Sequence, residues 1–188
     1  MINSFKELKI FLRSDSYRTG KKGYKIWGYY LRHPEYRYIV WFRIASYFIN
    51  KSKIIYFLSL IILQSLRNKT GIQIPIKTKI GKGFFIGHFG SIVINNHTII
   101  GDNCTITSNT TIGVTYRGKR AGVPIIGDNV YIGPGSRIFG RINVGNNVAI
   151  GANAVVNIDI PNNAVVGGVP CKIINLNGSN EYIRNQYN

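Results

Sequence analysis

The chain has 188 residues, of which 24 are Lys or Arg and 7 are Asp or Glu, so its net charge is +17. Its two cysteines, Cys104 and Cys171, exclude a disulfide framework and show no metal-binding spacing, and the hydrophobic content of 45% is enough for a core. No signal peptide is visible, since the first 18 residues contain no uninterrupted apolar segment. We therefore expect one or two small domains in a reducing, cytoplasmic setting, with no metal.

The basic excess is concentrated at the N-terminus. Residues 1–70 hold 14 Lys or Arg and 3 Asp or Glu (+11), whereas residues 71–188 hold 10 and 4 (+6). Such a charge favours phosphorylated cofactors, anionic lipid surfaces or nucleic acid as partners, although a solvated basic face is equally compatible with it. The later strands lack the interleaved aromatic residues of a nucleic-acid platform, so we expect no nucleic-acid partner.

Residues 1–70 are predicted to form a helical region. Ser4 and Glu7 have the spacing of a capping box, which starts a helix that we expect to end near Arg13, before a polar loop over residues 14–23. Apolar residues at helical spacing predict further helices over residues 24–31 and 37–49. Residues 52–67 are the most hydrophobic segment, but their apolar run is shorter than the roughly 20 residues that cross a bilayer.

Two interpretations fit this hydrophobic segment, and they can coexist. It could be a helical cap that buries one face on the following domain and another on a neighbouring subunit. Its basic flanks, Lys51, Lys53, Arg67 and Lys69, also suit peripheral contact with an anionic membrane, at the inner membrane face.

Residues 71–176 are organised by a period of six residues. An aliphatic residue returns at the same phase, very often followed by glycine: Ile74, Ile80, Ile86, Ile92, Ile100, Ile106, Ile112, Ile126, Ile132, Ile138, Val144, Ile150 and Val156. This period is neither helical nor that of a simple strand, and it suits a chain that turns a corner every six residues. Gly and Asn tolerate the left-handed backbone of such corners, and three faces make one coil of about 18 residues. The sequence therefore predicts a parallel β-helix from about residue 71 to 166, and a β-rich domain with chance spacing is the alternative.

Four residues after each aliphatic lies a second, mostly small position, which we expect to be buried: Cys104, Thr110, Val130, Ser136, Val148 and Ala154. The phase breaks twice, between Ile92 and Ile100 and between Ile112 and Ile126. Insertions in a solenoid leave the wall as loops, and the second loop is polar and basic. Residues 177–188 are polar, and we expect this tail to be frayed.

Histidine is the natural candidate for acid–base chemistry near neutral pH. His33 precedes Pro34 at a helix end and is interpreted as structural. His97 lies in the first phase break, and His88 follows a repeat corner between glycines and aromatic rings, so both are candidates. No phosphate-binding loop, zinc motif or serine-hydrolase elbow is present.

The hexads, the Gly87-His88 corner and the terminal segment from Gly167 to Lys172 resemble the left-handed β-helix acyltransferases, and within them the serine acetyltransferase branch with its capsule and exopolysaccharide relatives. The resemblance covers roughly residues 25–175. It implies a left-handed parallel β-helix of hexapeptide repeats with an N-terminal α-helical cap, assembled as a homotrimer. It also implies an O-acetyltransferase that uses acetyl-CoA as acyl donor, with the active site between neighbouring β-helices.

The resemblance also implies roles for residues. His88 falls on the family's general base, with Gln73 at the position of its partner. Cofactor binding falls on the edges of adjacent coils and the exit loop, which here implies Gly113, Tyr116, Arg117, Lys119, Pro134, Ala152 and Lys172, with Arg120 as a further cation.

Three positions depart from the serine acetyltransferase pattern. Where the family has an aspartate directly before the histidine, this chain has Gly87, and where the family has the partner aspartate, it has Gln73. The family's second histidine is also missing, since Val123-Pro124 stands at its position. A buried ammonium and carboxylate need paired partners, so we expect a sugar hydroxyl in surface-polysaccharide synthesis as acceptor. Serine O-acetylation in cysteine biosynthesis is the alternative, and a non-catalytic β-helix scaffold that docks through its basic helices is an alternative of another class.

Overall fold

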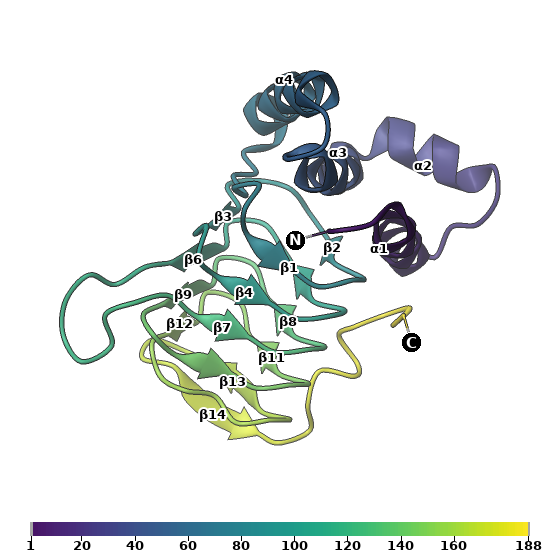
Figure 1. Cartoon of the computed structure of the whole chain (residues 1–188). Coiled ribbons are helices and arrows are strands. Elements are labelled where there is room, and N and C mark those ends of the chain that lie inside the picture. Colours follow the sequence, from purple (N-terminus) through teal and green to yellow (C-terminus); the bar gives the residue numbers. More distant parts are fainter. Residues whose placement is uncertain (1, 188) are drawn as a thin grey trace.

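The computed structural model describes residues 2–187. Its helices are α1 (Phe5–Arg18), α2 (Lys25–Arg32), α3 (Pro34–Phe48) and α4 (Lys53–Thr70). They gather at one end of a prism of short strands, with α3 and α4 packed together and α2 at the periphery (Figure 1). Among these helices none is long and apolar enough to cross a membrane.

The capping box of α1 is confirmed, but the predicted end of this helix is wrong. The Ser4 hydroxyl accepts a hydrogen bond from the Glu7 backbone N–H at 3.1 Å. The helix then continues to Arg18, through residues that polarity alone had assigned to a loop. Their polarity does not indicate a loop, because Ser14, Asp15 and Arg18 are buried against the strand domain and each has hydrogen-bond partners there.

The helices α3 and α4 form the predicted cap. Phe42 of α3 and Leu63 and Leu66 of α4 join one continuous core with Ile72 and the repeat aliphatics. Ser52 caps the start of α4, and Gly71 ends it with the positive φ of 70° that a residue with a Cβ adopts only at a cost. One face of the hydrophobic segment is therefore buried in the protein's own core.

The strand region is a left-handed parallel β-helix with three faces, as predicted. The β1 sheet holds β1 (Lys79–Ile80), β4 (Ile99–Ile100), β7 (Ile125–Ile126) and β10 (Asn143–Val144). The β2 sheet holds β2 (Phe85–Ile86), β5 (Thr105–Ile106), β8 (Tyr131–Ile132), β11 (Ala149–Ile150), β13 (Val165–Gly167) and the antiparallel β14 (Lys172–Asn175). The β3 sheet holds β3 (Val93–Ile94), β6 (Thr111–Gly113), β9 (Arg137–Phe139) and β12 (Val155–Val156).

Every aliphatic residue of the hexad points into the prism and is buried, as is each of the second positions. The corners between sheets are turned by residues in the left-handed region, with φ between 54° and 57°: Asn103, Asn109, Asn129, Asn147 and Asn153. Asparagine is tolerated there because its short side chain can hydrogen-bond locally. The six-residue period thus corresponds to one buried aliphatic and one corner per face.

Three edges separate the three sheets, and we name each edge by the sheets that it joins. The β1–β2 edge contains residues 81–84, 101–104, 127–130, 145–148 and 161–164. The β2–β3 edge contains residues 87–92, 107–110, 133–136 and 151–154. The β3–β1 edge contains residues 95–98, 114–124, 140–142 and 157–159, and the predicted second insertion leaves it as the long loop that projects from the prism in Figure 1.

Buried charges fix the helices on the β1–β2 edge. The Arg43 guanidinium of α3 donates to the Asp15 carboxylate of α1 at 2.8 Å and to the carbonyl oxygens of Ile80 and Gly81 at 2.7 and 2.6 Å. The side chains of Arg43 and Asp15 are both almost completely buried. Burial raises the pKa of Asp15, while the charge of Arg43 acts in the opposite direction. The ion pair therefore holds two helices and the first coil in one arrangement.

The prediction of a frayed C-terminal tail is wrong. Ser179 and Ile183 are buried, and the Tyr182 ring stacks on Tyr131 with 5.1 Å between centroids. The backbone N–H of Tyr187 donates to the Asn103 side chain at 3.0 Å. The tail runs back along the prism toward α1 (Figure 1), because the polar corners of the β1–β2 edge supply partners for a polar chain.

Candidate active site

The predicted base His88 lies on the β2–β3 edge, just after β2. The preceding Gly87 N–H donates to the Ile106 carbonyl at 2.9 Å, which places this corner directly above the next coil. The His88 side chain is exposed and so is Phe89. An exposed imidazole at a fixed corner is accessible to a hydroxyl substrate, as a general base requires.

The same edge brings His88 into one column with two predicted cofactor residues. Backbone hydrogen bonds link its successive turns: Asn109 donates to Gly90 at 2.6 Å, Gly135 to Ser108 at 3.0 Å and Asn153 to Pro134 at 2.8 Å. Pro134 and Ala152 are therefore at equivalent corners below His88, and both are exposed. Lys172 pairs with Gly167 at the far end of the β2 sheet and is also exposed.

Gln73 and Gly113 lie together in a different place, on the β3 sheet. They line a hollow of about 440 Å³, together with Arg67 at the end of α4 and Thr111 of β6. Gln73 pairs with Val93, donating to the Ile92 carbonyl at 2.7 Å. Since residues 87–92 lead directly from β2 into β3, Gln73 and His88 belong to the same first coil. Within the described chain, no hydrogen bond joins their side chains.

The loop of residues 114–124 is fixed at its base and exposed at its tip. Thr115 and Gly122 exchange backbone hydrogen bonds of 2.9 and 2.8 Å. Arg120 forms an ion pair with Asp159 at 2.9 Å, and the pKa of Asp159 is lowered by the Asn143 N–H and by Arg120. The ion pair of Arg120 with Asp159 therefore fixes the base of the loop.

The other predicted residues of the loop occupy its exposed tip: Tyr116, Arg117 and Lys119. Arg117 and Lys119 make this tip cationic. Both side chains are suited to phosphate, lysine as a compact positive charge and arginine as a bidentate hydrogen-bond donor.

Sequence reasoning missed further polar groups near this face. Arg137 of β9 donates to the carbonyl oxygens of Asn109 and of Gly135, the latter at 3.0 Å, and so adds a cation to the β2–β3 edge. Arg67, assigned to a basic helix end, lines the hollow instead. Their positions in the repeat and in the helix could have predicted that both side chains point outward. Those positions do not predict which of the outward faces carries the site.

The remaining histidines and cysteines fit other roles. His33 stacks on Tyr29 with 3.8 Å between ring centroids and contacts Glu35 at 2.8 Å, in keeping with a structural residue. His97 is exposed beside Lys77 and Lys79, on the β3–β1 edge. Burial raises the pKa of Cys104 to about 12, so this thiol stays protonated and is a poor nucleophile. Residues 2–187 contain no cluster of His, Cys, Asp and Glu side chains that could hold a metal ion.

Comparisons with known proteins find no matching family model. The chain is 38% identical over 150 residues to the serine acetyltransferase of Helicobacter pylori strain J99, covering 79% of this chain and 85% of the relative. It is 40% identical over 139 residues to the serine acetyltransferase of Staphylococcus epidermidis strain RP62A, covering 74% of this chain and 65% of the relative.

Solved structures give the same result. A serine acetyltransferase from Brucella abortus strain S19 matches with a TM-score of 0.76 and 26% identity, over 93% of this chain and 71% of that one. A serine acetyltransferase in complex with CoA matches with a TM-score of 0.74 and 26% identity, over 90% and 71%. These matches extend over the helices as well as the β-helix, so the likeness is not confined to the repeats.

Proposed function

The chain belongs to the hexapeptide-repeat serine acetyltransferase family, and from that premise we propose that it transfers the acetyl group of acetyl-CoA to the hydroxyl oxygen of L-serine. It is an acetyltransferase that uses acetyl-CoA. The choice of serine as acceptor rests on one observation: the two relatives described above are both serine acetyltransferases. The similarity to capsule and exopolysaccharide enzymes expected from the sequence is not shown, and the comparisons favour serine over a sugar.

In the proposed mechanism His88 is the general base. Its imidazole takes the proton from the acceptor hydroxyl while the hydroxyl oxygen forms a bond to the thioester carbonyl carbon. The resulting tetrahedral intermediate collapses as the carbon–sulfur bond breaks, and the imidazolium returns the proton to the departing CoA thiolate. Backbone N–H groups and a loop side chain would stabilise the oxyanion. Gln73 would orient the imidazole by a hydrogen bond formed when substrate binds.

The cofactor would lie along the column of corners below His88. Pro134 and Ala152 are exposed on this edge and leave room for the pantetheine arm. Arg117 and Lys119 at the loop tip and Lys172 at the far end would provide cations for its phosphates. These positions are assigned by the resemblance, and their common exposure supports the assignment.

We also propose that the enzyme is a homotrimer. His88 is on one edge of the β3 sheet and the basic loop is on the other. Packing of neighbouring prisms would bring one copy's His88 edge against another copy's loop and would complete a site that a single chain leaves open. Light scattering on a sizing column should give three times the mass of the chain, and a fully active monomer would contradict this assembly.

A neutral sugar hydroxyl is the second candidate acceptor, and a specific observation favours it. The hollow that contains Gln73 and Gly113 is lined by one cation, Arg67, and by no carboxylate within the described residues. The ammonium group of serine would lack an anionic partner there, and an unpaired buried charge is costly. A sugar hydroxyl makes no such demand.

The deciding experiment measures release of free CoA thiol from acetyl-CoA with L-serine, and in parallel with sugars and nucleotide sugars. Turnover with L-serine supports the proposed function. Turnover with a sugar and none with serine replaces it by the second candidate. If neither acceptor reacts and the protein does not bind CoA, the scaffold alternative gains and the catalytic proposal falls.

A pair of substitutions sharpens this choice. Gln73→Asp and Gly87→Asp restore the carboxylates expected of a serine acetyltransferase. A Cβ at position 87 would meet the Thr107 methyl at 3.3 Å, with the Ile106 carbonyl oxygen and the Phe85 ring at 4.0 Å. If serine is the acceptor, we expect the double variant to lower the KM for serine, by about tenfold for one added charge-assisted contact. Gln73→Asn is the matched control, because it changes length without adding charge.

A further inference from the structure

The helix α2 is packed differently from the other three helices. None of its residues is buried, whereas α1, α3 and α4 each bury four or more. It packs mainly on α3 through its inner face, and Figure 1 shows it at the periphery of the helical end of the molecule. Its outer face is therefore unpartnered in the single chain.

That outer face is aromatic and apolar. Tyr24, Trp27 and Leu31 are spaced by three and four residues, so they share one side of the helix, and their exposed fractions are 83, 69 and 67%. Gly28 lies on the same side, where a Cβ would meet no atom within 4 Å. We call Tyr24, Trp27 and Leu31 the α2 stripe.

The surroundings of the α2 stripe are strongly basic. Residues 21–32 contain Lys21, Lys22, Lys25 and Arg32 and no acidic residue. A second copy packed through the same basic face would be repelled by these cations. An anionic surface would be attracted to it.

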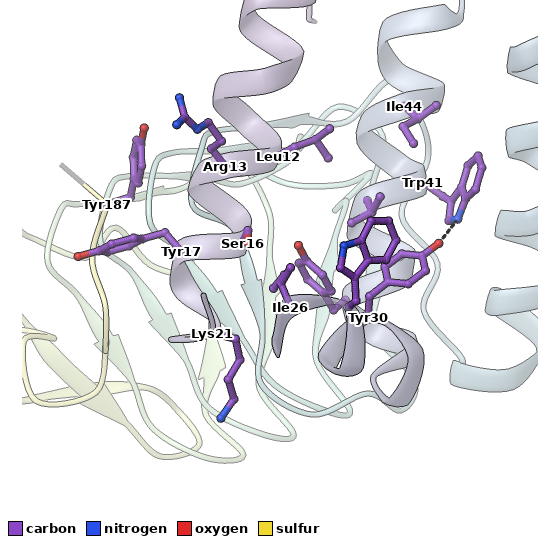
Figure 2. A pocket seen from close by; sticks show the side chains of 13 residues that line it. Leu12, Arg13, Ser16, Tyr17, Lys21, Ile26, Tyr30, Trp41, Ile44 and Tyr187 are labelled. Carbon is purple, nitrogen blue, oxygen red and sulfur yellow. Dashed lines mark hydrogen bonds between the residues drawn. The ribbon is translucent and has the colours of Figure 1, made fainter. Parts of the chain in front are cut away.

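A hollow of about 800 Å³ continues from the stripe into the molecule between α1, α2 and α3. Trp27 of the stripe lines this hollow together with Ile26, Trp41 and Ile44 and with the cations Arg13 and Lys21. Figure 2 shows Arg13 and Lys21 on α1 and the turn after it, and Trp41 and Ile44 on α3. The Trp41 indole N–H donates to the Tyr30 hydroxyl at 2.9 Å, so this donor in the wall has a partner. An apolar hollow with cations in its lining matches an acyl chain that ends in a phosphate headgroup.

We propose that α2 docks this enzyme on an anionic phospholipid bilayer. Trp and Tyr rings favour the interface between headgroups and hydrocarbon, and an amphipathic helix with basic residues lies there in the plane of the membrane. The α2 stripe enters the interface, Lys22 and Lys25 face the headgroups, and one acyl chain enters the hollow. This inference stands apart from the choice of acceptor, because it uses no residue of the β-helix.

The helix α4 provides the contrast. Its exposed residues include Ile54, Phe57, Leu58 and Ile61, but residues 54–66 carry no charge. The cations of α4 lie only at its two ends (Lys51, Lys53, Arg67 and Lys69), whereas Lys21, Lys22, Lys25 and Arg32 lie within a few residues of the α2 stripe, as an anionic membrane requires. The charge difference assigns the membrane to α2 rather than to the longer hydrophobic helix.

The experiment is sedimentation of the full chain with phosphatidylcholine vesicles, with and without about a third of phosphatidylglycerol. We expect binding to the anionic vesicles only, weakened by high salt. Trp27→Ser/Leu31→Ser should reduce the binding constant by about tenfold or more, through lost apolar contact. Lys22→Gln/Lys25→Gln should reduce it by roughly fivefold for each charge removed.

Matched controls carry equal changes elsewhere. Phe57→Ser/Ile61→Ser on α4 and Lys77→Gln/Lys79→Gln on the β-helix should leave binding within about twofold. Equal binding to neutral vesicles, no binding at all, or loss of binding in the α4 variant instead of the α2 variant would each overturn the proposal. So would conversion of an oligomer to a smaller species by Trp27→Ser/Leu31→Ser, since a second copy would then cover the stripe.

Depth of insertion gives a second measurement on the same protein. The chain has two tryptophans, so Trp41→Phe leaves Trp27 as the sole emitter. Lipids brominated along the acyl chain should quench Trp27 in anionic vesicles. Because Trp41 lines the hollow that one acyl chain enters, they should also quench a Trp27→Phe variant, whose remaining tryptophan is Trp41. Unquenched Trp27 emission from sedimented protein would contradict insertion of the stripe.

Discussion

The β1–β2 edge and the β2–β3 edge are built from the same repeat, yet only one of them is open. On the β1–β2 edge the side chains of Asn129, Asn147 and Asn163 are linked in a column by hydrogen bonds of 3.0 and 3.1 Å. The C-terminal tail packs over this column, and the Ser179 hydroxyl donates to the Asn129 carbonyl at 2.5 Å. On the β2–β3 edge Asn109 has the same left-handed backbone, but its side chain and those of His88, Pro134 and Ala152 are exposed.

The difference shows that the repeat constructs the prism without deciding where ligands bind. Both edges place a turn every coil, and both could stack small molecules along their corners. The helices and the tail cover the first edge and use its polar groups for folding. The second edge leaves the side chains of His88 and Asn109 exposed, so substitutions on the two edges should affect different properties if the proposed site lies there.

The largest effect is expected at the top of the covered edge. Arg43→Met should lower the free energy of unfolding by about 3–5 kcal/mol, because it leaves the buried Asp15 charge without its partner. Urea unfolding followed by circular dichroism measures this. Asp15→Asn/Arg43→Met should recover part of the loss, and a single Arg43→Met variant as stable as the wild type would show that the ion pair does not hold the helices.

On the open edge the corresponding change should affect the rate rather than stability. His88→Ala should reduce kcat/KM at least about 100-fold, equivalent to about 2.7 kcal/mol in the barrier, because the hydroxyl loses its base. Its urea midpoint should match that of the wild type. His97→Ala is the matched control and should keep nearly full activity. A loss of less than tenfold for His88→Ala would exclude His88 as the base.

One pair of substitutions compares the edges directly. Asn129→Ala and Asn109→Ala both remove the short amide that makes the left-handed backbone tolerable, at φ values of 54° and 57°, which costs at most about 1–2 kcal/mol each. Asn129→Ala also removes the hydrogen bond to Asn147, so its total should be greater by about 1 kcal/mol. Equal losses of unfolding free energy in urea would mean that the column of side chains adds nothing to the covered edge.

The smallest effect is expected at the loop tip. Arg117→Gln/Lys119→Gln should raise the KM for acetyl-CoA about fivefold and leave kcat nearly unchanged, because exposed cations contribute to uniform binding of phosphates. Initial rates at varied acetyl-CoA concentration measure this. Lys6→Gln/Lys9→Gln removes the same charge from exposed positions of α1, outside the proposed cofactor path, and an equal rise in KM there would assign the effect to net charge alone.

Much of the scaffold could be predicted from the sequence. The hexad identified most of the buried aliphatics from Ile74 to Val156, the burial of Cys104 and the loop after Ile112. It missed the buried Ile94 and Ile142, and it placed the first phase break after Ile92, whereas the two extra residues lie between β2 and β3 and Ile94 pairs with Ile112. Family resemblance then pointed to His88 and to an enzyme that uses acetyl-CoA. The comparisons favour serine, the alternative acceptor, over the sugar expected from the sequence, because single departures such as Gln73 and Gly87 report what a site lacks and not what its substrate is.

The sequence by itself thus determined the period, the core and the corner chemistry of this protein. These are local properties, since each aliphatic residue and each asparagine is set by neighbours a few residues away. Tertiary structure alone decided that Ser14 to Arg18 are helical, that the tail packs and that the β2–β3 edge stays open. Those outcomes depend on single contacts between distant segments, such as Arg18 with the Arg184 carbonyl at 3.0 Å, and a contact that occurs once leaves no period in the sequence.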